Sequence, residues 1–304
     1  MVEGFAKHEV NGKTKYRGRS RATLELLKVC QEIIRETAPI TIRGVAYRLF
    51  VLGRIDSMAK SNVQAVGRTL GWAREENLVD WDSIVDESRQ VERQPHWKDL
   101  ESYGEAVAQS YRRDFWSHQS HRLLLISEKS TVAGILRPVL DAYGVSFFTA
   151  HGFNSKTKMH DFAEDVLRDP RRTVFLYVGD FDPSGMFMSK VDMPKRLAKY
   201  GCASDTYTLT RIALTDGDVN SHSRNLPSFQ AEEKKTDPRH SWYVSNYGKR
   251  CWEVDAMDPN DLRDRIKSEI ERYVEPGDWQ QHKNIEQAQR ETTRRVAQAM
   301  AAAK

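Results

Sequence analysis

The stretch FLYVGDFDPSG, residues 175–185, decides the fold class of this chain. An apolar run ends abruptly in two aspartates one residue apart, Asp180 and Asp182, and a proline and a glycine follow. The D-x-D spacing sends both carboxylates to the same side of an extended backbone, whereas Phe181 points the opposite way. Because the proline and the glycine then turn the chain, we expect the carboxylates at the rim of a sheet and out of its core.

The sequence on both sides of this stretch alternates apolar runs with helical patterns. RLLLISEKS and VSFFTAHG precede it as expected strands, and TVAGILRPVLDAYG and KTKMHDFAEDVLRD are expected helices between strands. VDMPKRLAKYG and YTLTRIAL follow it as a further helix and strand. The runs are apolar throughout, so this β-α-β-α-β order predicts an α/β unit with a mostly parallel, Rossmann-like sheet that is covered on both faces.

A second expected strand, LLLIS, also ends in a carboxylate, Glu128. Functional groups gather at the carboxyl ends of strands in an open parallel sheet. If the two strands are neighbours, Glu128 converges with Asp180 and Asp182 on a hard-oxygen site suited to Mg²⁺. A lone D-x-D-P-x-G is more often a simple turn. Three convergent like charges repel one another without a cation, which favours the metal site.

The N-terminal part reads as three short helices. RATLELLKVCQEIIRETA closes near Thr37, TIRGVAYRLFVLG is capped by Thr41, and SNVQAVGRTLGWAREENL follows, with Arg68 and Arg74 on its polar side. VDWDSIVDES is an expected short strand or ribbon. This order suggests a winged helix-turn-helix, which commonly lays its last helix in the major groove of DNA, although small trihelical domains also bind proteins. Trp72 and Trp81 are expected in its core.

The length of 304 residues allows two domains, and we expect an intracellular protein. No apolar run approaches the length that spans a bilayer, and the first residues carry no apolar leader. The net charge is +4, and the first 21 residues hold six lysines and arginines against two glutamates. Such a basic segment is a solvated tail or an arm on nucleic-acid phosphates. Cys30, Cys202 and Cys251 are too far apart in sequence for a zinc motif.

The motifs together resemble a known family. LLISEKS, followed further along the chain by GDFDPSG, resembles the Toprim domain of topoisomerases and related nucleases, and more closely the A subunit of topoisomerase VI and the meiotic double-strand-break protein. TIRGVAYRL places Arg43 and Tyr47 at the spacing of that family's tyrosine motif, but Gly44 and Ala46 stand where the family has an acidic and an aromatic residue. CWEVDAMDPNDLRDRI resembles the segment after the Toprim core, so the resemblance covers about residues 20–275.

The resemblance implies a winged-helix domain before a Toprim domain. The expected division is a basic tail (1–21), a winged helix (22–95), a connector (96–120), the Toprim domain with its extension (121–275) and a C-terminal helix (276–304). The C-terminal helix is expected to have an apolar seam at Ile285, Val296 and Met300. It also implies a homodimer on double-stranded DNA, in which the tyrosine of one protomer meets the metal site of the other. The expected location is the cytoplasm, with the nucleoid.

The residues allow a matching chemistry. Arg43 and Tyr47 lie i, i+4 on one helix face, apart from the apolar stripe. A neighbouring guanidinium can hold a phosphate and favour the phenolate, whose unperturbed pKa is about 10. As the resemblance implies, Tyr47 would then form a covalent 5′-phosphotyrosyl link, while Mg²⁺ on the three carboxylates neutralises charge and Glu128 relays a proton.

Other readings remain open at this point. One alternative hypothesis is a Toprim nuclease that hydrolyses DNA or RNA with the same carboxylates, in which Tyr47 is a structural residue. Another is a non-catalytic DNA-binding protein. Further candidate DNA contacts are Lys129, Lys235 and Arg239, the last two in a polar loop. No nucleotide-binding motif is present, so strand passage would require energy from a separate subunit, such as a GHKL-type ATPase.

Overall fold

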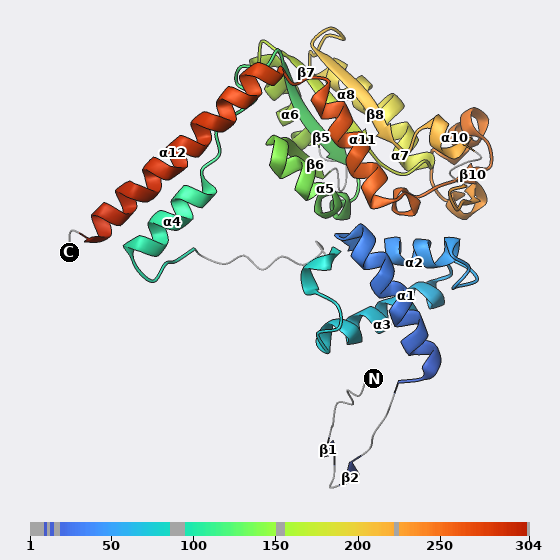
Figure 1. The fold of residues 1–304 in the computed structure, drawn as a ribbon. Helices are drawn as coiled ribbons and strands as arrows, with labels where there is room; N and C mark the ends of the chain where they lie inside the picture. Colours follow the sequence, from blue (N-terminus) through green and yellow to red (C-terminus); the bar gives the residue numbers. More distant parts are fainter. Residues whose placement is uncertain are drawn as a thin grey trace. The chain divides into compact units, whose positions relative to one another are not determined.

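The chain forms two compact units, Met1–Val85 and Asp86–Lys304. The computed structural model describes residues 9–10, 13–14, 19–85, 95–149, 156–221 and 225–302 (Figure 1). Most of the basic tail expected over residues 1–21 lies outside the described residues. Within it, β1 (Glu9–Val10) pairs antiparallel with β2 (Lys13–Thr14).

The first unit is built on the three expected helices, which are α1 (Arg21–Thr37), α2 (Ile42–Val51) and α3 (Lys60–Glu75). The side chain of Thr41 caps α2 by accepting a hydrogen bond from the backbone N–H of Gly44, as expected. The apolar faces of the helices enclose a core that includes Leu27, Ile34, Val45, Leu49 and Leu70. Trp72 packs against this core, as expected, whereas Trp81 is exposed, so its expected place in the core is wrong.

The ribbon expected after α3 is short. A 3₁₀ turn, η1 (Trp81–Ser83), leads into β4 (Ile84–Val85), which pairs in parallel with β3 (Ile40–Thr41). Residues 86–94, which include the end of the expected ribbon, lie outside the described residues. Over residues 19–85 this unit therefore consists of three helices, the η1 turn and one two-residue parallel strand pair, with no hairpin after α3.

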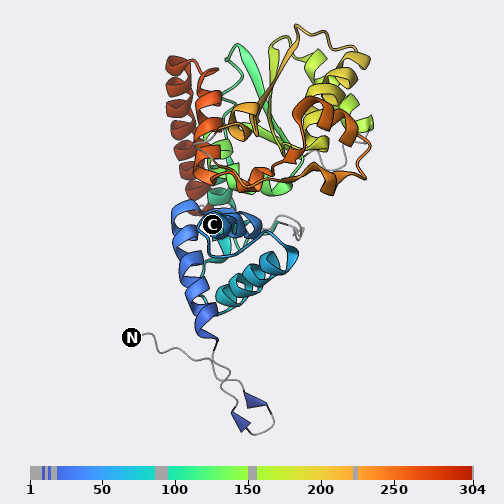
Figure 2. The ribbon, with the colours of Figure 1, turned by 90° about the vertical axis from the view of Figure 1, so that its right-hand side faces the viewer.

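The second unit contains the expected parallel sheet. Its strand order is β6-β5-β7-β8, and all three pairings are parallel. The strands are β5 (His121–Ser127), β6 (Ser146–Thr149), β7 (Arg172–Val178) and β8 (Tyr207–Ala213). The runs that are apolar throughout do mark buried strands, because β5 and β7 lie in the middle of the sheet with helices on both faces (Figures 1 and 2).

Two helical layers cover this sheet. On one face, side chains of β5 and β7 such as Ile126 and Phe175 pack with Met159 of α6 and Leu197 of α8. On the other face, α5 packs against β5 and α11 against β8, and the two helices contact each other. The layers are α5 (Ser130–Tyr143), α6 (Lys156–Arg168), α7 (Pro183–Phe187), the π-turn η2 (Met188–Asp192), α8 (Met193–Lys199) and α11 (Pro259–Glu271).

The polar region between β8 and α11 holds more structure than its sequence suggested. Its elements are α9 (Asp216–Val219), β9 (Phe229–Gln230), η3 (Ala231–Lys234), α10 (His240–Tyr247), β10 (Arg250–Cys251) and η4 (Val254–Ala256). β9 and β10 pair antiparallel. The sequence of α10, HSWYVSNY, has no apolar stripe, which explains why its pattern did not indicate a helix.

Two helices form an arm that extends away from the sheet. α12 (Pro276–Ala302) lies along α4 (Leu100–Ser110), as Figure 1 shows. They approach closely because residue 104 is glycine, where a Cβ would stand 2.0 Å from the Cβ of Ala297. The expected seam of α12 is wrong, since Val296 and Met300 are exposed. None of the helices in the described residues is long and apolar enough to cross a membrane.

Candidate active site at the acidic sheet edge

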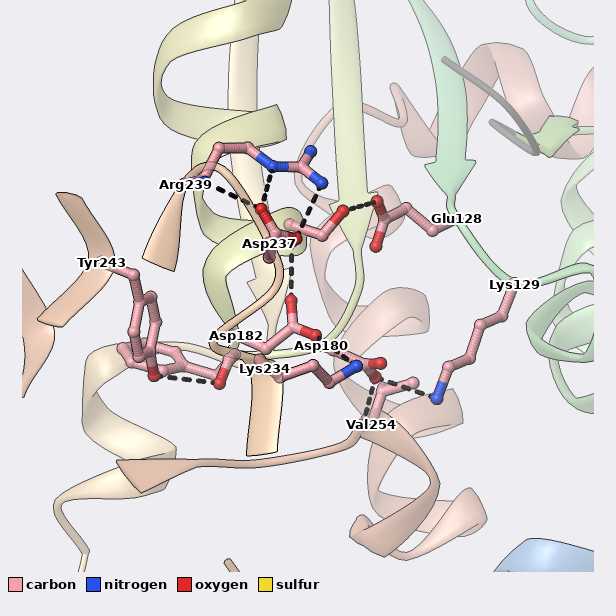
Figure 3. A network of polar contacts seen from close by, with 12 residues as sticks. Glu128, Lys129, Asp180, Asp182, Lys234, Asp237, Arg239, Tyr243 and Val254 are labelled. Carbon is pink, nitrogen blue, oxygen red and sulfur yellow. Dashed lines mark hydrogen bonds and ion pairs between the residues drawn. The ribbon is translucent and has the colours of Figure 1, made fainter. Parts of the chain in front are cut away.

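The sheet brings Glu128 and the Asp180–Asp182 turn to one edge. β5 and β7 are paired in register to their ends, with Ser127 opposite Val178. Glu128 follows β5 directly, and Asp180 follows β7 after one glycine. The expected adjacency of the two strands is therefore confirmed, and Figure 3 shows the carboxylates on the same side of the sheet end.

The residue between the two aspartates anchors the turn. Phe181 forms an antiparallel bridge with Trp252, with backbone hydrogen bonds of 2.9 and 3.0 Å. Its ring is buried and packs edge-on against Tyr247 and Trp252, and the hydroxyl of Tyr243 donates a hydrogen bond to its carbonyl oxygen. These contacts hold Phe181, and with it the backbone of the turn between the two aspartates, in the aromatic cluster.

The start of α7 holds the second aspartate. Oδ1 of Asp182 caps α7 by accepting a hydrogen bond of 2.8 Å from the backbone N–H of Gly185. A Cβ on Gly185 would lie 2.3 Å from the carbonyl oxygen of Asp180, so the turn admits only glycine there. The carboxylates are more enclosed than the turn signal suggested. Asp180 is 9% and Asp182 4% exposed, because side chains and backbone from later in the chain cover them.

Two lysines neutralise part of this acidic edge (Figure 3). Nζ of Lys129 lies 3.0 Å from Oδ1 of Asp180 and 2.7 Å from Oδ2 of Asp255. Nζ of Lys234 lies 3.3 Å from Oδ2 of Asp182. The predicted DNA contact Lys129 thus binds two carboxylates. Asp255 and Lys234 were not predicted as partners, because both approach from distant segments of the chain.

The carboxylates of the site lie close together, and their negative charges affect one another. Burial raises the pKa of Glu128, and the charges of Asp182 and Asp180 raise it further, although the hydroxyl of Ser184 donates to Oε1 at 2.9 Å and opposes the rise. Burial also raises the pKa of Asp180, with Lys129 opposing and Asp182 adding. Carboxylates with perturbed pKa values that face one another are a mark of functional sites.

The donor set fits Mg²⁺ in its chemistry. Three carboxylates supply the oxygen ligands that this ion prefers, and Oε2 of Glu128 accepts no hydrogen bond from the described residues. The arrangement does not fit, since among the described residues no group of three or more His, Cys, Asp or Glu side chains is placed to hold a metal ion. An ammonium group lies instead on an oxygen of Asp180 and on one of Asp182.

A half-buried arginine that the sequence analysis missed fixes the backbone of this edge. The guanidinium of Arg211, on β8, donates to the carbonyl oxygens of Gly179, Asp180, Gly185 and Leu214 and to the hydroxyl of Ser189. It also lies over the ring of Tyr177, 5.1 Å from the centroid. One charged residue in the middle of the strand YTLTRIAL was the available signal, because a strand interior seldom buries a guanidinium without a dedicated set of acceptors.

The other candidate contacts of this unit are engaged within the chain. Arg239 forms two hydrogen bonds with the carboxylate of Asp237, at 2.7 and 2.8 Å, and its charge lowers the pKa of Glu128 against the dominant effect of burial. Figure 3 shows this pair beside Glu128. Lys235 pairs with Glu232 on the surface. Of the predicted DNA contacts in this loop, Arg239 therefore belongs to the acidic edge and Lys235 does not.

The candidate residues of the first unit meet on α2. Cζ of Arg43 lies 5.8 Å from the ring centroid of Tyr47, which confirms that the two side chains are neighbours. Tyr47 is only 3% exposed, although it is not part of the apolar core cluster of the unit. On α3, Arg68 is exposed, and Arg74 stacks on Trp81 with Cζ 4.3 Å from the ring centroid.

Comparison with known proteins adds no relative. A scan against protein-family models finds no match for this chain, and searches of curated proteins and of solved structures find none either. The residues of the acidic edge and of α2 therefore remain as the basis for a function. The geometry of the acidic edge is the stronger of the two, because it brings carboxylates from the ends of two adjacent strands together, whereas Arg43 and Tyr47 are neighbours on a single helix.

Proposed function

We propose that this chain is a Mg²⁺-dependent DNA-cleaving enzyme similar to the A subunit of topoisomerase VI, with a winged-helix unit followed by a Toprim unit. The observation that carries the proposal is the convergence of Glu128, Asp180 and Asp182 at the ends of two adjacent parallel strands. Carboxylates at such an edge suit transfer of a phosphoryl group, where catalysis consists mainly of positioning and of charge stabilisation.

In this proposal Tyr47 is the nucleophile. Its phenolic oxygen forms a bond to the phosphorus of the DNA backbone, the bond from phosphorus to the 3′-oxygen breaks, and the protein stays attached to the 5′ end. The phenolic proton leaves to water, and Glu128 supplies a proton to the 3′-oxygen. Mg²⁺, when bound, would neutralise charge on the phosphate. Arg43 beside Tyr47 supports this role, because a guanidinium binds phosphate and favours the phenolate.

The proposed partner is double-stranded DNA. α3, with Arg68 exposed on it, would lie in the major groove, and Arg74 would contact a phosphate. The active enzyme would be a homodimer in which Tyr47 of one protomer serves the acidic edge of the other. Strand passage would require a separate GHKL-type ATPase subunit, whereas cleavage alone would not.

The test is cleavage of supercoiled plasmid with MgCl₂. The purified full chain is incubated with plasmid, then denatured, with and without protease, and the products are separated on a gel. We expect linear DNA whose 5′ ends carry protein, and we expect Tyr47→Phe to abolish both the cleavage and the attachment. Absence of cleavage with both Mg²⁺ and Mn²⁺ would favour a non-catalytic DNA-binding protein and would overturn the proposal.

A second candidate is hydrolysis by the same carboxylates without a covalent intermediate. The burial of Tyr47, at 3% exposed, favours it, because a buried hydroxyl cannot reach a phosphate without a rearrangement. This candidate predicts that Tyr47→Phe still cleaves and leaves free 5′ phosphates, while Asp182→Asn abolishes cleavage. The plasmid experiment with the two variants therefore separates the two reactions.

A further inference from the structure

The sheet has an open edge at β8. β8 is the last strand in the order β6-β5-β7-β8, so no strand of the described residues pairs with its outer side. The carbonyl oxygen of Thr206 accepts from the N–H of Thr173 on β7, and the backbone groups of successive residues point to alternate edges of a strand. The N–H and the C=O of Leu209 therefore point away from β7. Such an edge is a template for pairing with another chain.

β8 lacks the features that usually protect an edge strand, which are short length, lysine, proline and bulges. It has seven residues, YTLTRIA, and from Tyr207 to Arg211 its pairing with β7 is regular. The guanidinium of Arg211 is bonded to carbonyl groups of its own unit, so this charge does not guard the edge. β6, at the other edge of the sheet, has only four residues. The edge of β8 is therefore suited to accept a further strand.

A groove of about 550 Å³ lies between β8 and α11, which Figure 1 shows beside each other. Thr210 and Ile212 line it from β8, and the exposed residues Asp264, Ser268 and Arg272 line it from α11. The three helix residues are four positions apart, so they form one row along α11. This row has an acid at one end, a base at the other and a small polar residue in the middle.

The middle of the row lies level with the middle of β8. Nη1 of Arg265 lies 3.5 Å from the carbonyl oxygen of Ile212, near the end of β8. Tyr273, directly after the row, packs on His121 at the start of β5, with ring centroids 5.1 Å apart. Ser268 lies between these two levels, so it is level with the central residues of β8. One two-fold axis perpendicular to the sheet therefore passes beside both centres.

We propose that a second copy of this chain docks on this face, with the two β8 strands paired antiparallel about a two-fold axis near Leu209 and Ser268. Leu209 of each copy then exchanges backbone hydrogen bonds with Leu209 of the other, and the two sheets become continuous. On the helices, Asp264 of each copy faces Arg272 of the other. Arg272 contacts Glu269 in the single chain, but 71% of its side chain is exposed, so it turns to the second copy without leaving a core.

The charges of the row select this occupant. In the antiparallel arrangement each end of the row meets the opposite charge, whereas a parallel arrangement would place acid on acid and base on base. The proposed function requires a homodimer, and the inference rests on that function for the use of the dimer and names its surface. The surface holds none of the proposed catalytic residues, and the dimer is tested without DNA and without a metal ion.

The first test is sedimentation velocity of the full chain over a range of protein concentrations. We expect a monomer–dimer equilibrium. Asp264→Arg turns two attractive contacts into two repulsive ones, so its dissociation constant should rise about tenfold or more. The double variant Asp264→Arg with Arg272→Asp exchanges the two charges and should restore the dimer. Asp141→Arg is the matched control, since it makes the same change at an exposed position of α5 outside the groove. Thermal melts verify that the variants fold.

The second test is cross-linking at the axis. Ser268→Cys places a thiol opposite its own copy, so a short bismaleimide should join two chains. The three native cysteines are buried and should not react. Ser245→Cys is the matched control, because Ser245 is an exposed serine on α10 that does not line the groove. We expect a cross-linked dimer from Ser268→Cys and none from Ser245→Cys, as read on a denaturing gel.

Each outcome has a definite meaning. A dimer that Asp264→Arg weakens and the charge exchange restores, with cross-linking at Ser268→Cys alone, supports the inference. Monomers at every concentration overturn it. A dimer that Asp264→Arg leaves unchanged, or that Asp141→Arg weakens equally, also overturns it, because another surface or net charge then governs association. Failure of plasmid cleavage leaves these results as they are, so the proposed function and this inference fail separately.

Discussion

Two buried aspartates follow neighbouring strands of the same sheet and meet opposite surroundings. Asp218, after β8, accepts hydrogen bonds from Nη2 and Nη1 of Arg265, at 2.6 and 2.9 Å, and from the backbone N–H and the hydroxyl of Thr215. Burial alone would raise the pKa of Asp218, but these partners outweigh it and the pKa is lowered. Asp180, after β7, has one ammonium and one backbone N–H, and its pKa is raised.

We interpret the difference as that between a structural charge at Asp218 and a candidate functional charge at Asp180. Asp218 is matched by a fixed, bidentate partner, so its negative charge belongs to the folded state. Asp180 faces a second aspartate and a glutamate, and burial prevails over its lysine. Natural proteins accept such a cost at sites where an ion or a substrate later supplies the missing charge. Variants at the two positions should therefore differ in the size and in the sign of their effects.

The largest effect is expected when Asp218 loses its partner. Arg265→Met leaves a buried carboxylate uncompensated, which lowers the free energy of unfolding by about 3 kcal/mol. The measurement is urea denaturation of the full chain followed by circular dichroism. Arg272→Met is the matched control, because Arg272 pairs with Glu269 from an exposed position directly after α11, and we expect it to cost less than about 0.5 kcal/mol. Equal costs would mean that Asp218 does not depend on Arg265.

A smaller cost is expected from a single methyl group at Gly185. Gly185→Ala places a Cβ 2.3 Å from the carbonyl oxygen of Asp180, so the turn must shift, at a cost of about 2 kcal/mol. Gly217→Ala is the control beside the other aspartate, where the nearest atom, Oγ1 of Thr215, would be 3.6 Å away. We expect the control to be neutral or slightly stabilising, because alanine favours helix. Melting temperatures of both variants decide the point, and a neutral Gly185→Ala would show that the turn is not tight.

Neutralising Asp218 itself should cost about 1–2 kcal/mol at pH 7, since Arg265 then loses a charged hydrogen-bond acceptor. The lowered pKa of Asp218 gives the pH dependence of this cost. A depressed folded-state pKa adds stability above the unfolded value, near 3.9 for aspartate, and the stability disappears as the pH falls through the folded value. The gap in unfolding free energy between the unmodified chain and Asp218→Asn should therefore close below about pH 4. A gap that persists in acid would contradict the ion pair.

The position of the site was readable from the sequence because it depends on topology. Apolar runs at β-α-β spacing predict parallel neighbours, and Glu128, Asp180 and Asp182 follow from the ends of such strands. These inferences need only local pattern and one general rule of sheet architecture, and they hold here.

The partners of the charges were not readable, because they come from distant parts of the chain. Lys129 meets Asp255 across 126 positions, and Arg211 meets carbonyl groups that no side-chain pattern reveals. The predicted apolar seam of α12 is wrong for a related reason. Its inner face carries His282 and Glu286, which bond to Arg113, so a search for apolar periodicity selects the wrong side.

The smallest effect on stability is expected at Asp180, and it carries the sharpest contrast with Asp218. In Asp180→Asn the amide oxygen still accepts from Val254, and Lys129 keeps Asp255 as its partner. The variant also removes a charge that repels Asp182 and Glu128. We expect a change in the free energy of unfolding within about 0.5 kcal/mol of zero, or a small gain, together with loss of plasmid cleavage. Denaturation and cleavage are measured on the same preparation. A cost as large as that of Asp218→Asn would show that both aspartates are structural and would remove the main support for a catalytic acidic edge.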